Sequence, residues 1–280
     1  MKDDLKNRVG IIVRQIVHDL MDKVMDKVLC ADPFVPEKHH ASKPMYSALV
    51  PDEIFKGAHF ERRFVTPFGG VWEKLAVTVA REIHGDCKQG ETIEGVVPEE
   101  RLQRIQQVLN ELEHGIGGER RRKPDWESEL SYILAGTGNL IPVSVTCDIV
   151  IDSRLLGKKL AFELKAPLPN SDQTKVSKEK MFKLLAMEPT VVDYAYYALP
   201  YNPYGKREKY EWSFPMRWFD MKHDSSVLIG EDFWNLIGGD FAYKTIIDEI
   251  NSLGKNYKER IYRGYLGIEP PRNIEDFMKY

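Results

Sequence analysis

Apolar residues in the first part of the chain recur every three or four positions, which is the period of an amphipathic helix. The first such stripe runs from Leu5 to Val28. Two more stripes predict helices over Val71–His84 and Pro98–Glu113. Pro67 and Gly69 precede the predicted helix that begins at Val71, and we expect them to interrupt helical structure there. The N-terminal portion is therefore predicted to be helical.

The period changes to two from Ile141, where Val143, Val145, Cys147, Ile149 and Ile151 alternate with their neighbours. Such alternation is typical of a strand with two different faces. A turn over Ser153–Gly157 and a second alternating stretch over Lys158–Pro167 complete a predicted β-hairpin. Further predicted elements are a lysine-rich helix (Thr174–Met187), a strand (Val191–Leu199) and a helix (Tyr243–Leu253).

Helices and strands in this order predict an α/β fold in a single domain of 280 residues. We expect three parts within it. Residues 1–60 form an N-terminal helical extension, residues 61–255 the catalytic core, and residues 256–280 a C-terminal tail.

Composition narrows the class of protein. Apolar residues make up 42% and charged residues 30% of the chain, with a formal net charge of −3, which excludes a disordered chain and a histone-like polycation. The charge is unevenly distributed along the chain, because the segment from Lys158 to Lys183 contains seven lysines and only three acidic residues. Three cysteines without a CxxC pair, no secretory signal and no long apolar run predict a protein of the reducing cytoplasm.

The hairpin carries the arrangement with chemical meaning. Glu163 and Lys165 are two positions apart, so they project from the same face of a strand. Asp148 and Asp152 both have the parity to face them. A turn centred between residues 155 and 156 would place Asp148 opposite Glu163 and Asp152 opposite Lys159.

Two carboxylates that face each other repel, unless a cation lies between them. Asp148 and Glu163 therefore indicate either a site for a divalent cation such as Mg²⁺ or a different register. Lys165 beside such a site could orient a water and stabilise charge on a phosphate. An Asp followed by Glu-x-Lys after a turn is the active-site pattern of PD-(D/E)xK nucleases. The alternative is a surface hairpin with a salt bridge between Glu163 and Lys165.

Longer segments resemble type II restriction endonucleases of the TdeIII family. The resemblance extends from about residue 45 to residue 250. The segments that carry it are Phe60–Gly69, Phe162–Asn170, Ala198–Gly205 and Ile229–Gly239, together with the lysine-rich helix.

This resemblance implies a restriction-endonuclease-like mixed β-sheet flanked by helices. It also implies Mg²⁺-dependent hydrolysis of double-stranded DNA at a short palindrome, of the GGNCC type, with Mn²⁺ as a substitute for Mg²⁺. The implied catalytic residues are Asp148, Glu163 and Lys165, and the metal ligands are Asp148, Glu163 and the carbonyl of Leu164. A further glutamate from an early helix would be Glu73, although Glu82 lies on the same helix.

A palindromic site suits a homodimer, in which each active site cuts one strand. A cognate DNA methyltransferase is expected as a genetic, not physical, partner. Two other hypotheses stay open: a structure-specific repair or recombination nuclease of the same fold, and a non-catalytic DNA-binding protein. Candidate DNA contacts are Arg120, Arg121, Arg122, Lys123, Asn170, Lys175 and Lys178.

Overall fold

The computed structural model describes residues 2–114 and 121–271, and the chain divides into two compact units. The first unit combines the N-terminal segment up to Leu75 with the C-terminal segment from Lys244. The second unit comprises Ala76–Tyr243. The expected N-terminal extension and C-terminal tail lie at opposite ends of the sequence, yet they belong largely to the same unit.

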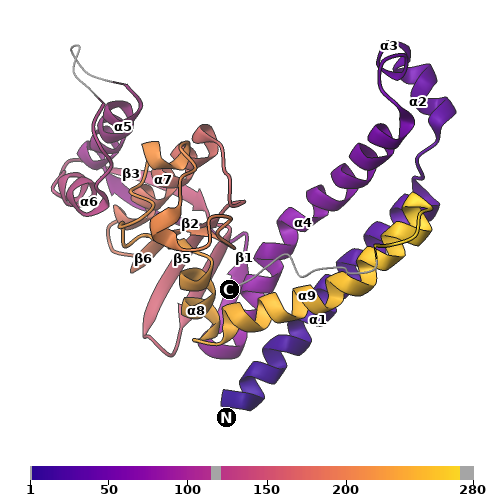
Figure 1. The fold of residues 1–280 in the computed structure, drawn as a ribbon. Helices are drawn as coiled ribbons and strands as arrows, with labels where there is room; N and C mark the ends of the chain where they lie inside the picture. The colour runs from indigo at the N-terminus through magenta and orange to yellow at the C-terminus, as the bar shows by residue number, and fades with distance from the viewer. Residues whose placement is uncertain (1, 115–120, 272–280) are drawn as a thin grey trace. The chain divides into compact units, whose positions relative to one another are not determined.

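Two long helices lie side by side in the first unit (Figure 1). They are α1 (Lys2–Asp26), which continues as a π-helix over Lys27–Ala31, and α9 (Ala242–Arg260), which continues as a π-helix over Ile261–Leu266. Arg14 lies 3.0 Å from Glu249, and the Tyr257 hydroxyl donates to Asp22 over 2.8 Å. Because these partners advance together along both helices, α1 and α9 run parallel. The helices predicted near these positions are confirmed, and α9 is longer than expected.

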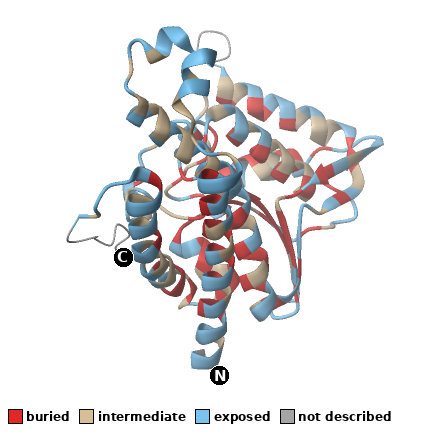
Figure 2. Ribbon diagram, turned by 90° about the vertical axis from the view of Figure 1, so that its right-hand side faces the viewer, coloured by how far each residue is buried: buried red, intermediate tan, exposed pale blue. Residues whose placement is uncertain are grey.

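Helix α4 spans Asp52–His84 and passes through Pro67, where the sequence predicted an interruption. The rings of Phe60, Phe64, Phe68 and Trp72 follow one another at intervals of four residues, with centroids 5.0–6.3 Å apart. Such i, i+4 contacts stabilise a helix and offset a part of the cost of proline within it. The short helices α2 (Pro36–Ser42) and α3 (Pro44–Ser47), by contrast, contain no buried residue (Figure 2).

The second unit is built on a five-stranded mixed sheet in the order β1-β4-β5-β6-β7. Strands β1, β4 and β5 are antiparallel neighbours, whereas β5, β6 and β7 run parallel. With its flanking helices, this sheet confirms the predicted restriction-endonuclease-like α/β fold. The strands are β1 (Gly85–Gln89), β4 (Ile149–Ser153), β5 (Lys158–Leu164), β6 (Tyr194–Leu199) and β7 (Val227–Ile229).

The predicted hairpin is β4–β5, and its predicted register is confirmed. Ile149 pairs with Phe162, and Asp152 pairs with Lys159. Continuing this register by one position brings Asp148 opposite Glu163. The third predicted core strand is β6, which begins at Tyr194, three residues later than expected.

The alternating stretch that starts at Ile141 forms two strands instead of one. Its first part is β3 (Leu140–Thr146), which pairs with β2 (Thr92–Pro98) in a separate two-stranded sheet. Its second part is β4 in the main sheet. The chain leaves one sheet and enters the other at Cys147 and Asp148, because each half finds its own hydrogen-bonding partner.

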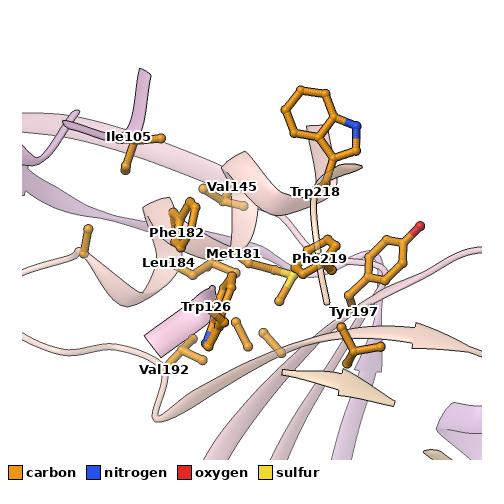
Figure 3. Packing of buried hydrophobic residues seen from close by; sticks show 14 of the residues in the cluster. Ile105, Trp126, Val145, Met181, Phe182, Leu184, Val192, Tyr197, Trp218 and Phe219 are labelled. Atoms are coloured by element: carbon orange, nitrogen blue, oxygen red, sulfur yellow. The ribbon is translucent and has the colours of Figure 1, made fainter. Parts of the chain in front are cut away.

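Further helices pack in the second unit. Helix α7 connects β5 to the parallel strand β6, and its position agrees with the predicted lysine-rich helix. Trp126 of α6 stacks on Phe182 of α7 with ring centroids 4.7 Å apart, and Tyr197 of β6 stacks on Phe219 at 4.8 Å (Figure 3). The helices are α5 (Glu99–Glu113), α6 (Trp126–Leu134), α7 (Ser171–Leu185) and α8 (Glu231–Gly238). Of the helices in the described residues, none is long and apolar enough to cross a membrane.

Candidate active site

Asp148 occupies the crossing point between the two sheets, and its position is fixed from both sides. The backbone N–H of Gly90, in the turn between β1 and β2, donates to the Asp148 carbonyl over 3.0 Å. The side-chain carboxylate accepts from the Leu164 N–H over 2.8 Å. Asp148 is thus tied to the last residue of β5, next to Glu163.

Glu163 is almost completely buried, with 2% of its side chain exposed. Ser177 donates to its Oε2 over 3.2 Å, and Lys180 donates to its Oε1 over 2.6 Å. Burial is the main cause that raises the pKa of Glu163, and the neighbouring Asp148 carboxylate raises it further. The ammonium groups of Lys165 and Lys180 act in the opposite direction.

Lys165 bridges the two carboxylates. Its Nζ lies 2.6 Å from Asp148 Oδ2 and 3.4 Å from Glu163 Oε2. Burial alone would lower the pKa of Lys165, but the two carboxylates outweigh it and raise that pKa. Lys165 is therefore protonated at neutral pH, and it can donate hydrogen bonds and stabilise negative charge. The structure thus brings the three predicted catalytic side chains together.

The site's donor set suits a hard divalent cation. Mg²⁺ is usually held in proteins by one or two carboxylates together with water and substrate phosphates. Asp148 and Glu163 supply two carboxylates close enough to act on each other's charge, and Leu164 lies between Glu163 and Lys165 in the chain. Across residues 2–114 and 121–271, no three Asp, Glu, His or Cys side chains come together as a metal site. A cation here would therefore be coordinated by these two carboxylates, the Leu164 carbonyl and a substrate phosphate.

Two residues that position Glu163 were not singled out by sequence reasoning. Ser177 and Lys180 lie three positions apart on α7, so they share a face of the helix, and Thr174 extends the same face. Thr174 and Ser177 are fully buried, and Thr174 Oγ1 lies 3.0 Å from the Tyr197 hydroxyl. A polar stripe at helical spacing, on a helix that follows the Glu-x-Lys strand, was the signal available in the sequence.

The predicted DNA contacts of the loop near α6 differ from one another. Arg121 and Lys123 are exposed. Arg122 is half-buried and lies 3.1 Å from Glu111 of α5. Arg120 lies outside the described residues.

The predicted DNA contacts at α7 have structural partners. Asn170 is the N-cap of the helix, where its side chain accepts from the Gln173 N–H over 2.8 Å. Lys175 forms an ion pair with Glu113. Lys178 is fully buried, 2.5 Å from Glu129 of α6. Its ammonium is enclosed by the core and out of reach of DNA in this fold, which corrects the predicted contact.

Glu73 and Glu82 both lie in α4, as expected. Because they are nine residues apart, they project from opposite sides of the helix. Glu73 is half-buried in the first unit, and Glu82 is exposed in the second. At most one of them can therefore face a given site.

The mixed five-stranded sheet with its flanking helices is consistent with the restriction-endonuclease-like fold class, and Asp148, Glu163 and Lys165 lie together at the end of its β4–β5 hairpin. The chain belongs to the HinfI family of type II restriction endonucleases, because the model of that family, "Type II restriction endonuclease, HinfI", matches residues 11–254. Membership in this family implies a nuclease that acts on DNA. The type II class that the resemblance to the TdeIII family predicted is thus shown, and the matching model is that of HinfI.

Type II restriction enzymes of Herpetosiphon aurantiacus are similar to this chain over most of their length. HgiEI is 24% identical over 260 residues, which cover 90% of this chain and 93% of the relative. HgiBI is 26% identical over 217 residues, covering 76% and 77%. HgiCII is 25% identical over 229 residues, covering 80% and 82%.

Proposed function

We propose that this chain is a type II site-specific deoxyribonuclease that hydrolyses double-stranded DNA at a short palindrome and requires Mg²⁺. We further propose a PD-(D/E)xK active site composed of Asp148, Glu163 and Lys165. The observation that carries the proposal is the bridge of Lys165 across the opposed carboxylates, at 2.6 and 3.4 Å. The resemblance to TdeIII-type enzymes supports a GGNCC-like site and Mn²⁺ as a substitute for Mg²⁺. A palindromic site in turn suits a homodimer. The expected cytoplasmic location and the genetic link to a DNA methyltransferase belong to the same proposal.

The proposed site residues have separate roles in metal binding and in charge stabilisation. Asp148, Glu163 and the Leu164 carbonyl would hold Mg²⁺, which when bound supplies Lewis-acid stabilisation of the phosphate and activates a water. The protonated Lys165 orients the water and stabilises the negative charge that develops on the phosphate oxygens. The Leu164 N–H holds the Asp148 carboxylate in place. The further glutamate that the resemblance implies, Glu73 of α4, stays a prediction of the sequence.

Substitution of the three residues tests this assignment. Asp148→Ala, Glu163→Ala and Lys165→Ala should each lower the rate of plasmid cleavage by at least about 100-fold, the usual effect of removing one group that stabilises transition-state charge. Asp152→Ala is the matched control, because Asp152 lies in the same hairpin and faces Lys159 instead of Glu163. Cleavage retained by all three active-site variants would refute the assignment.

The digest itself tests the specificity. Discrete fragments with identical end sequences, formed in Mg²⁺ and abolished by a chelator, are the expected result. Sequencing of the fragment ends then identifies the palindrome. Nicking that follows DNA structure instead of sequence would contradict a restriction activity.

A further inference from the structure

The four charged groups of the site already cancel one another. Asp148 and Glu163 carry two negative charges, and Lys165 and Lys180 carry two positive ones. The closest contacts are the two at 2.6 Å, one from each lysine to one carboxylate. Since Glu163 is 2% exposed, its charge is balanced by these ammonium groups and not by solvent.

The two lysines are placed differently. Lys165 follows β5, its backbone N–H donates to the Ala198 carbonyl over 3.0 Å, and its side chain contacts both carboxylates. Lys180 comes from α7, contacts Glu163, and leaves 28% of its side chain exposed. A flexible lysine stem that reaches solvent can move its ammonium away from the carboxylate.

Resting on the proposed function, we infer that Lys180 is the counter-ion of Glu163 in the metal-free enzyme, and that a divalent cation must displace it. A cation entering the neutral cluster would add two uncompensated positive charges. The phosphates of bound DNA would balance that excess, and so would release of the Lys180 ammonium toward the DNA backbone. Lys180 therefore keeps the affinity for the metal low in the absence of DNA. It also reduces the repulsion between the two carboxylates and the DNA phosphates.

Direct measurement of metal binding tests this role. Free Mn²⁺ is followed by electron paramagnetic resonance while it is titrated with the full-length protein in the absence of DNA. Lys180→Met and Lys180→Gln remove the charge, and the second keeps an N–H donor for Glu163. Both variants should bind Mn²⁺ at least about tenfold more tightly than the unmodified protein. Lys180→Arg keeps the charge and should stay within about twofold.

Lys183 provides the matched control. It lies three residues further on the same helix, and its ammonium is 2.7 Å from Glu179. Lys183→Met should leave Mn²⁺ affinity unchanged.

DNA binding in a chelator gives a second readout. The Met and Gln variants of Lys180 should bind a DNA fragment that the enzyme cuts about tenfold more weakly, because Glu163 then keeps an unbalanced charge near the phosphates. Unchanged or weaker Mn²⁺ binding in both variants would overturn the inference, since Lys180 would then only orient Glu163.

Failure of this inference can be told apart from failure of the proposed function. If the unmodified protein cuts DNA and Glu163→Gln abolishes both cutting and Mn²⁺ binding, the proposed site stands whatever Lys180 does. If Glu163→Gln binds Mn²⁺ and cuts like the unmodified protein, the proposed site itself is wrong.

Discussion

Lys178 and Glu129 form an ion pair from which water is excluded. Both side chains are 0% exposed, and their charged atoms are 2.5 Å apart. The rings of Trp126, Phe182 and Phe219 surround the ammonium, with centroids 4.7–5.6 Å away. Burial lowers the pKa of Lys178 and raises the pKa of Glu129, while the attraction between them opposes both shifts. This pair ties α6 to α7, the helix that holds Glu163 through Ser177 and Lys180.

Removing one partner should therefore be costly for stability. Lys178→Met leaves the Glu129 carboxylate buried without its counter-ion, and we expect the free energy of unfolding to fall by about 3–5 kcal/mol. The double variant Lys178→Met with Glu129→Gln should recover part of this loss, because neither position of the pair then carries a buried charge, while the buried Asp224 still loses the Lys178 ammonium. Urea unfolding measures both values. A double variant as unstable as the single one would show that the charge is not the cause.

At the scale of the element, the connection between β5 and α7 is held by three aromatic side chains. The Tyr210 hydroxyl donates to the Pro167 carbonyl over 2.8 Å, and Trp212 Nε1 donates to the Pro169 carbonyl over the same distance. Trp218 Nε1 donates to the Ser171 hydroxyl over 3.0 Å. These bonds fix the extended chain between Lys165 and the first turn of α7, so strand and helix are aligned at the site.

The N-cap of α7 belongs to the same junction. Asn170→Ala removes the bond to the Gln173 N–H, and we expect a loss of about 1 kcal/mol in the free energy of unfolding. Asn170→Ser and Asn170→Asp can cap the helix and should lose less. Thermal melts of the three variants compare them. Unchanged stability in Asn170→Ala would show that this N-cap bond does not stabilise the fold.

For the molecule as a whole, the net charge of −3 conceals a positive segment between Lys158 and Lys183. The structure uses several of these lysines internally: Lys165 and Lys180 at the carboxylates, Lys178 in the core and Lys175 with Glu113. We therefore expect other cations to contribute to the long-range attraction of DNA, among which Arg121 and Lys123 are exposed.

Salt dependence checks this expectation. Each lost phosphate contact lowers the slope of log affinity against log salt by about one. Arg121→Ala with Lys123→Ala should thus reduce the slope by about two and weaken binding to all sequences alike. Fluorescence anisotropy across a KCl series measures it, with Lys183→Ala as the control. An unchanged slope would remove both residues from the DNA interface.

The sequence by itself determined the features that depend on local period and spacing. Alternation fixes which side chains share a face, and both Asp148 and Asp152 satisfied it, so the position of the short turn defined the β4–β5 register. The same register brought Asp148, Glu163 and Lys165 together. The apolar stripes predicted α1, α5 and the C-terminal part of α4.

The tertiary structure decided what depends on partners far away in the chain. Strand β1 contains a single buried residue, Cys87, and is a strand because β4 pairs with it. Asp148 lies between β3 and β4, the two strands into which the alternating stretch divides, and these strands belong to different sheets. Lys178 and Lys180 look alike in sequence, yet one meets Glu129 in the core and the other meets Glu163 at the site. A local pattern can place these lysines on a face of α7, but burial and charge pairing depend on which elements pack against that face.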